Sequence, residues 1–242
     1  MHRIFLVISL CWSLAAAAAD EALIRSTIEA KLGGAKVEGI QPTPIPGIYE
    51  VRFRSSDNVQ IIYTNADATH IIIGRLIEVK TDRDLTEERM RKLTTINMDT
   101  LPYDLAVKVR RGNGKRTLAI FSDPNCPACK KFEKELATID DITIHYFMYP
   151  VIRPELADQS RAVWCSPDRS KAWLDLALRG KPVAGGTTKC DAPIEKVLEL
   201  GTKLGVRATP TMFLATGERL RGGTSAAELK TLLDEAANPK KK

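Results

Sequence analysis

Two cysteines, Cys126 and Cys129, stand close together in the stretch Phe121 to Lys130, which reads FSDPNCPACK. The apolar run TLAIFSD precedes them, and CPACKKFEKELATI, which has the periodicity of an amphipathic helix, begins with them. Two thiols at this spacing can hold a metal ion, close a short structural loop, or exchange electrons with another disulfide.

The position of the pair favours exchange. Cys126 falls where a strand would end and a helix begin, and Pro127 suits the first helical position, where its missing N–H costs nothing. The sulfur of Cys126 would then lie at the positive end of the helix dipole, which favours the nucleophilic thiolate form. Cys129 follows one helical turn later. We predict that Cys126 attacks a substrate disulfide and that Cys129 resolves the mixed disulfide.

The other uses of a dithiol fit less well. A structural zinc site needs a second cysteine pair or spaced histidines, whereas His70 and His145 lie far apart in the sequence. Covalent haem attachment needs a histidine directly after the second cysteine, where this chain has Lys130. A purely structural Cys126–Cys129 disulfide stays open, although so short a loop adds little stability. The sequence thus predicts no metal and no cofactor.

The start of the chain predicts export. Arg3 is followed by an apolar run and then by alanines, which is typical of a signal peptide covering residues 1–19. The apolar run is too short to span a bilayer comfortably, so we expect no stable membrane insertion, although an uncleaved anchor is the alternative. The formal net charge of +6 is mild and dispersed, and no nucleic-acid-binding module is visible, so no nucleic-acid partner is expected.

Export gives the remaining cysteines a different meaning. Cys11 would leave with the signal peptide, and an oxidising compartment favours disulfides among the others. Cys165 and Cys190 have no redox spacing and bracket helix-rich sequence. We interpret them as a permanent structural disulfide, because two free thiols would be unfavourable in that compartment.

The first domain is predicted over residues 20–80. A helix over residues 22–32 precedes three runs with apolar alternation, IYEVRFR, VQIIYT and HIIIGRLIEV, which predict a small antiparallel meander. A unit of this size buries little core, and one sheet edge would be open. We therefore expect a homodimer through this domain. A monomer whose sheet packs on its own helix is the alternative.

The rest of the chain predicts a helical linker over residues 81–104 and a larger domain over residues 105–238. Strand and helix alternate in this domain, with an inserted helical stretch, which favours a sheet layered with helices. Asp191 is a plausible N-cap for the helix in DAPIEKVLELGTKLG. Thr209 and Pro210 precede the strand TMFLA. A cis proline there would expose backbone beside the dithiol, but an ordinary turn proline is the simpler interpretation of these residues alone.

These residues together resemble the DsbC/DsbG family of bacterial periplasmic disulfide isomerases, and DsbC most closely. The likeness extends over nearly the whole chain after the signal peptide. IQPTPIPGIYEV and HIIIGRLIEV resemble the family's dimerisation domain, and FSDPNCPACKKF, AVWC, KC and GVRATPTMFL resemble its catalytic domain, in that order.

The resemblance implies both fold and function. It implies a cystatin-like dimerisation domain of helix plus antiparallel sheet (α+β), followed by a thioredoxin fold with a helical insertion (α/β). It implies a V-shaped periplasmic homodimer that receives misfolded, disulfide-containing exported proteins, with accompanying chaperone activity. A DsbD-type membrane reductase would keep Cys126 and Cys129 reduced. Thr209-Pro210 would be the cis-proline substrate loop packed against Cys126, and the likeness also supports the Cys165–Cys190 disulfide.

One departure from the family pattern leaves other activities open. DsbC proteins commonly have Gly-Tyr between the active cysteines, whereas this chain has Pro127-Ala128, and the intervening pair tunes redox poise. The alternatives are a dimeric holdase, a DsbG-like chaperone and reductase of oxidised single cysteines with little isomerase activity, and a net oxidase.

Overall fold

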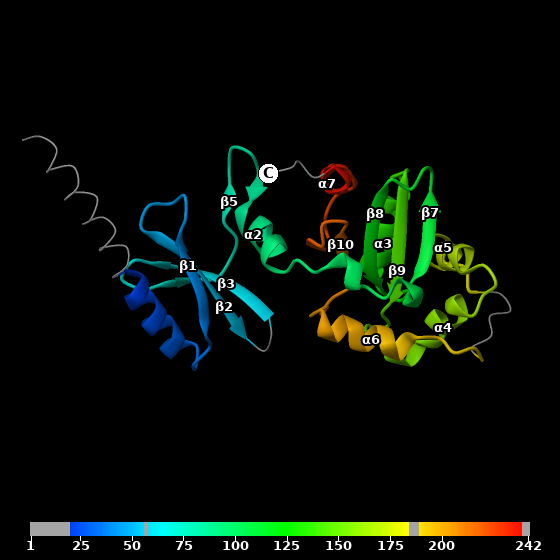
Figure 1. Ribbon diagram of the computed structural model, residues 1–242, viewed down its shortest axis with the longest axis horizontal. Helices are drawn as coiled ribbons and strands as arrows, with labels where there is room; N and C mark the ends of the chain where they lie inside the picture. Colours follow the sequence, from blue (N-terminus) through cyan, green and yellow to red (C-terminus); the bar gives the residue numbers. More distant parts are fainter. Residues whose placement is uncertain (1–19, 56–57, 184–188, 239–242) are drawn as a thin grey trace, which may run out of the picture. The chain divides into compact units, whose positions relative to one another are not determined.

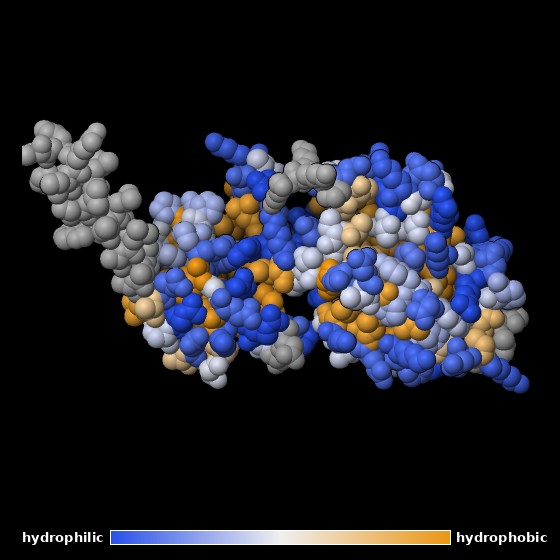
Figure 2. Space-filling view, viewed as in Figure 1, coloured by the Kyte–Doolittle hydropathy of each residue, from blue (hydrophilic) through white to orange (hydrophobic). Residues whose placement is uncertain are grey.

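The computed structural model describes residues 20–55, 58–183 and 189–238, so the predicted signal peptide, residues 1–19, lies outside the described residues. The chain divides into two compact units, Met1–Leu93 and Thr94–Lys242 (Figure 1). The visible surface of each unit is mostly hydrophilic with smaller hydrophobic patches (Figure 2). Across the described residues, no helix combines the length and the apolar character needed to cross a membrane.

The N-terminal unit is a four-stranded antiparallel sheet with a helix over residues 20–31. The strands are in the order β1 (Val37–Pro42), β2 (Ile48–Ser55), β3 (Asn58–Asn65) and β4 (Ile71–Ile72). Ile24 and Ile28 of the helix are fully buried and pack with apolar residues of the strands, among them Val51. Helix plus antiparallel sheet is the fold predicted for this domain, and it is confirmed.

The third strand predicted for this unit is wrong, because the observed strand is much shorter. In HIIIGRLIEV, only Ile71 and Ile72 pair with β3, while Ile77–Glu78 forms β5 and pairs with β6 (Arg83–Asp84). The interruption falls at Gly74, a residue that is unfavourable inside a strand.

Helix α2 (Leu85–Leu93) closes the N-terminal unit and is held against its sheet. The hydroxyls of Thr86 and Tyr63 form a buried hydrogen bond. Arg89 Nε donates to the carboxylate of Glu50 on β2 at 3.1 Å. The helix is thus attached by buried polar contacts rather than by a wide apolar stripe.

The C-terminal unit is built on a five-stranded mixed sheet. Its central strands β8 (Arg116–Ser122) and β9 (Ile142–Met148) are parallel, and the outer pairings are antiparallel. Along the sheet the strands are in the order β11 (Arg219–Arg221), β10 (Thr211–Leu214), β8, β9 and β7 (Val107–Arg111). Helices cover both faces of this sheet, as predicted from the alternation of strand and helix.

Strand β8 shows why the sheet must be covered on both faces. Leu118 and Ile120 point into one core cluster, with Phe132 of α3 (Pro127–Leu136) and Leu229 of α7 (Ala226–Ala237). Ala119 and Phe121 point into the other, with Val197 of α6 (Ile194–Lys203) and with the segment before β7. A strand buried on both faces has a continuous apolar sequence instead of an alternating one, which is what TLAIF shows.

Most helical elements of this unit lie between strands in the chain, and α7 follows the last strand (Figure 1). The α-helices are α3 (Pro127–Leu136), α4 (Asp158–Trp164), α5 (Arg169–Arg179), α6 (Ile194–Lys203) and α7 (Ala226–Ala237). Short 3-10 turns are η1 (Met98–Thr100), η2 (Tyr103–Leu105) and η3 (Pro154–Leu156). Helix α6 begins after Pro193 and has no side-chain cap, so the N-cap expected at Asp191 is wrong.

Candidate active site: a dithiol beside a cis-proline loop

The loop between β8 and α3 carries the dithiol, and hydrogen bonds of Asp123 hold this loop in place. This aspartate is fully buried. Its carboxylate accepts hydrogen bonds from the backbone N–H of Asn125 at 2.7 Å and from that of Ile152 at 2.8 Å. Its carbonyl oxygen accepts the backbone N–H of Cys126 at 3.1 Å. Asp123 therefore sets the path of the chain into the first cysteine.

Cys126 is the N-cap of α3, and Pro127 stands at the start of the helix. The cysteine backbone is extended, with φ −80° and ψ 118°, and its sulfur accepts the backbone N–H of Cys129 at 3.4 Å. A sulfur placed at a helix N-terminus receives unpaired N–H groups and the positive end of the helix dipole, and both stabilise a thiolate.

A second loop, much further along the chain, contacts the sulfur of Cys126. The Thr209-Pro210 peptide bond is cis. The Cys126 thiol donates to the carbonyl oxygen of Thr209 at 3.3 Å. Thr209 is buried at this contact. The structure thus brings together the four residues Cys126, Cys129, Thr209 and Pro210 that the sequence analysis singled out.

The two thiols are in different environments although both are unpaired and buried. Burial raises the pKa of the Cys129 thiol to about 12, despite hydrogen bonds to Ser122, Asp123 and Thr209 that lower it. Cys129 is therefore a protonated thiol at neutral pH. Because thiolates and not thiols attack disulfides, the raised pKa makes Cys129 a poor first nucleophile of this pair.

Cys165 and Cys190 form a disulfide away from this loop. Cys165 ends α4, and its Cα lies 5.7 Å from that of Cys190, which precedes α6. Cys165 also packs against the core cluster that contains Trp173. The bridge ties the inserted helices α4 and α5 to the start of α6.

The sequence analysis did not single out Asp123 or Tyr149. Asp123 lies within the quoted motif, and an acidic residue directly after a buried strand and before a helix N-cap is a usable signal. Tyr149 gives no such signal. It contacts Phe121 edge-on, with ring centroids 5.6 Å apart, and its hydroxyl donates to the carbonyl of Val206 at 3.1 Å, so its role depends on segments distant in the chain.

Comparison with known proteins agrees with this architecture. Residues 103–237 match the thioredoxin-like domain family, and residues 15–87 match the disulfide bond isomerase protein N-terminal domain. The probable thiol:disulfide interchange protein DsbC of Bordetella parapertussis is 37% identical over 210 residues, which cover 87% of this chain and 73% of the relative. DsbC of Escherichia coli K12 is 30% identical over 223 residues, which cover 90% and 89%.

A solved structure supports the same assignment. The disulfide interchange protein from Neisseria gonorrhoeae matches with a TM-score of 0.54 and 37% identity, over 57% of this chain and 99% of that chain. A thioredoxin-like domain with a dithiol at a helix N-terminus defines a thiol:disulfide oxidoreductase. The chain belongs to the DsbC family of thiol:disulfide interchange proteins, which confirms the resemblance.

Proposed function

We propose that this chain is a periplasmic protein disulfide isomerase, in which the Cys126 thiolate attacks non-native disulfides of exported proteins and Cys129 resolves the mixed disulfide. One observation carries the proposal. The Cys126 sulfur lies at the start of α3, accepts the N–H of Cys129 and contacts the Thr209 carbonyl. We further propose that residues 20–80 form the dimerisation domain, 81–104 the linker and 105–238 the catalytic domain.

Isomerisation needs no external reductant, because disulfide exchange within the client involves no net oxidation or reduction. The Cys126 thiolate bonds to one sulfur of a client disulfide, that S–S bond breaks, and the second client sulfur leaves as a thiolate. This thiolate attacks another disulfide of the client, and a final attack on the mixed disulfide releases Cys126 as a thiolate. Burial keeps Cys129 protonated, with its pKa raised to about 12, which gives the client time to rearrange.

Cys129 releases Cys126 from the mixed disulfide when the client does not rearrange. Once deprotonated, its sulfur attacks that of Cys126, the mixed disulfide breaks, and the client leaves with both of its cysteines reduced. The chain is then left with an oxidised Cys126–Cys129 disulfide. A reductant must restore the dithiol, and a DsbD-type membrane reductase is the partner that we propose for this step.

The loop at Thr209-Pro210 is the proposed site of client backbone contact. The Thr209 carbonyl lies 3.3 Å from the Cys126 sulfur, so a chain bound along this loop would present a disulfide to that sulfur. Main-chain pairing of this kind is independent of client sequence. It therefore suits an enzyme that must accept many misfolded proteins.

We propose a homodimer through the N-terminal unit, with chaperone activity. Ile72 of the edge strand β4 and Ile73 directly after it are 52% and 85% exposed. Exposed apolar residues beside an open strand edge support pairing with a second copy. Export to the periplasm is supported by the signal-like sequence of residues 1–19.

The test is refolding of a scrambled multi-disulfide protein by the reduced chain without its signal peptide. Wild type should restore native client, and Cys126→Ala should restore none. Cys129→Ala should accumulate client bound through Cys126, because the resolving thiol is missing. If Cys126→Ala were as active as wild type, the proposed mechanism would be wrong. If neither restored client while both prevented its aggregation, a holdase would replace the isomerase.

A DsbG-like reductase is the second candidate, and the Pro127-Ala128 pair favours it, because it departs from the Gly-Tyr typical of DsbC. Such an enzyme would reduce a client cysteine sulfenic acid, releasing water and forming a mixed disulfide that Cys129 resolves. Rapid reduction of a sulfenic acid client with little recovery of scrambled client would select this function over isomerisation.

A further inference from the structure

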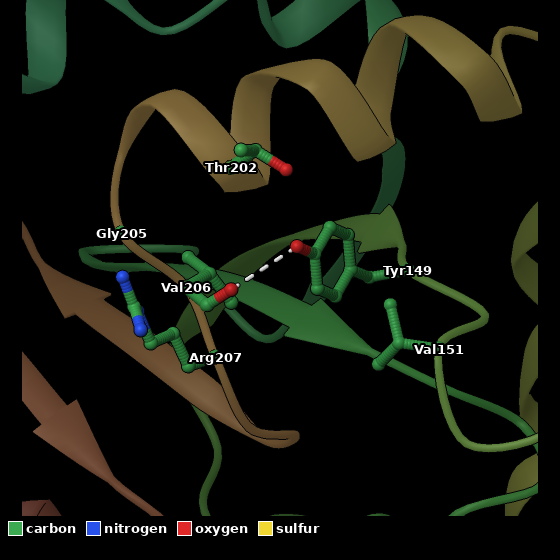
Figure 3. Close-up of a pocket in the computed structure, with 6 residues that line it drawn as sticks. All are labelled: Tyr149, Val151, Thr202, Gly205, Val206 and Arg207. Atoms are coloured by element: carbon green, nitrogen blue, oxygen red, sulfur yellow. Dashed lines mark hydrogen bonds between the residues drawn. The ribbon is translucent and has the colours of Figure 1, made fainter. Parts of the chain in front are cut away.

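A cavity of about 350 Å³ lies in the C-terminal unit. Figure 3 shows its walls, which come from the segment after β9, the end of α6 and the segment that leads to Thr209. The volume is at the lower end of the range of about 300–1,000 Å³ for ligand pockets, which suits one large side chain. The residues that line it are Tyr149, Val151, Thr202, Gly205, Val206 and Arg207.

The inner wall of the cavity is rigid. The buried Tyr149 donates its hydroxyl to the carbonyl of Val206 at 3.1 Å, as drawn in Figure 3. A Cβ at Gly201 of α6 would lie 2.2 Å from the Tyr149 ring, so only glycine lets the ring lie this close to the helix. The cavity is therefore framed by fixed contacts rather than by a gap between movable side chains.

Two of the segments that line the cavity are connected directly to the catalytic site. The Asp123 carboxylate holds the backbone of Ile152, the residue after Val151, while it also shapes the loop into Cys126. On the other side, Arg207 precedes Thr209 by two residues, which span at most about 7 Å of extended chain. A client held at Thr209 would thus extend past the cavity within a few residues of its reacting cysteine.

The cavity is lined by an apolar side chain, Val151, and by a positively charged one, Arg207. Val151 and Ile152 are 36% and 49% exposed, although both are large apolar residues. Arg207 lies on the opposite wall and is also exposed. An apolar client side chain in the cavity would be buried against Val151, and a neighbouring carboxylate would be attracted to the Arg207 guanidinium.

We propose that this cavity is a client-specificity subsite. It takes an apolar side chain, aliphatic or aromatic, from a client residue near the cysteine that Cys126 attacks, and Arg207 favours an acidic residue next to that side chain. The proposal rests on the proposed function only in that a client disulfide must reach Cys126. It requires no dimer and no isomerisation.

The test uses single-cysteine peptides carrying mercaptoethanol as a mixed disulfide. In each reaction the reduced chain becomes the Cys126–Cys129 disulfide, and free peptide thiol and mercaptoethanol are released. One Leu, or Ser in the matched peptide, is moved through the three positions on either side of the cysteine, with Asp or Lys beside it. We expect a Leu peptide to react about 5-fold faster than its Ser partner at one position or more.

Variants assign that preference to the cavity. Val151→Ser and the cavity-filling Thr202→Trp should abolish the Leu preference, and Arg207→Glu should reverse the preference for Asp over Lys. The matched controls are Val79→Ser, which changes an exposed valine of the other unit, and Lys203→Glu, which changes a nearby exposed charge outside the cavity lining. Both controls should keep the wild-type preferences.

A small neutral disulfide, bis(2-hydroxyethyl) disulfide, reports on the dithiol alone, and its rate should stay the same in every variant. Equal rates for Leu and Ser peptides at all positions would overturn the proposal. An equal loss of rate toward the peptides and toward the small disulfide in the cavity variants would also overturn it, because the cavity residues would then act on the dithiol. A Leu preference without refolding of scrambled protein would refute isomerisation and leave the subsite standing.

Discussion

The sulfur of Cys126 lies 3.3 Å from the carbonyl oxygen of Thr209, a residue 83 positions further along the chain. The sheet explains this contact. Strands β8 and β10 pair antiparallel with Phe121 opposite Thr211, so the segment leaving β8 and the segment entering β10 meet at one end of the sheet. The register of β8 and β10 thus places the Cys126 sulfur against the cis-proline loop.

The unequal thiols predict selective alkylation. Because burial raises the pKa of Cys129 to about 12, about one Cys129 thiol in ten thousand is ionised at pH 8. Native reduced chain treated with iodoacetamide at pH 8 should be modified at Cys126 and not at Cys129, as read by peptide mass spectrometry. Cys129→Ser should be modified like wild type, and Cys126→Ser should stay unmodified until the pH approaches 12 or the chain is unfolded. Rapid modification of native Cys126→Ser at pH 8 would contradict the burial argument.

The dithiol was predictable because all of its determinants are local. A buried strand run, a helix-compatible Pro127 and an amphipathic helix surround the two cysteines, so both sulfurs could be placed from about 20 residues of sequence. The N-cap of α7 depends on residues just as close in the chain, because the Ser225 hydroxyl accepts the N–H of Glu228 at 3.2 Å.

The parts that could not be predicted depend on distant segments. Strand β7 has only two buried valines in the basic sequence VKVRR, and it exists because it pairs with β9. The run HIIIGRLIEV alternates like a strand, but among the described residues of the unit Ile73 stays 85% exposed. The cavity beside Tyr149 needs three separate segments, which no local pattern specifies.

The Cys165–Cys190 disulfide should stabilise the C-terminal unit. The two residues are 25 positions apart, and the chain-entropy model gives about 3.5 kcal/mol for closing such a loop. Urea unfolding of Cys165→Ala/Cys190→Ala, followed by tryptophan fluorescence, should show a loss of this order, because Trp164 and Trp173 both lie in this unit. Cys126→Ala/Cys129→Ala removes two thiols without opening a loop and should cost much less. Equal losses in the two double variants would mean that the bridge adds no stability.

The exposed edge of the N-terminal sheet should determine the oligomeric state. Ile73 is 85% exposed next to β4, and a lysine there would introduce charge into an apolar contact between copies. Wild type should be a dimer at micromolar concentration by light scattering, and Ile73→Lys should be a monomer with an unchanged circular dichroism spectrum. Leu23→Lys, which changes an exposed apolar residue of the leading helix, should remain dimeric. A monomeric wild type, or a dimeric Ile73→Lys, would remove the proposed interface.

Glu133 should make the stability of the C-terminal unit depend on pH. Its side chain is buried on α3, where the Tyr146 hydroxyl donates to its carboxylate at 2.9 Å. Burial raises the pKa of Glu133 to about 7, against the lowering effects of that hydrogen bond and of Arg111. Below about pH 4.5 the folded and unfolded chains both carry the proton, whereas between about 4.5 and 7 only the folded chain does. This contribution to stability is therefore fully present below pH 4.5 and is lost as the pH rises to 7, by about 3 kcal/mol.

Glu133→Gln isolates this effect, because its amide oxygen can still accept from Tyr146 and it carries no charge at any pH. The stability of the variant relative to wild type should rise by about 3 kcal/mol between pH 4.5 and 7.5, whatever constant cost the amide adds. Urea unfolding followed by tryptophan fluorescence at a series of pH values measures this difference. The exposed Glu235→Gln on α7 is the control, and its difference from wild type should be flat over the same range. A flat difference for Glu133→Gln would show that the buried carboxyl keeps an ordinary pKa, and that the contacts with Tyr146 and Arg111 offset its burial.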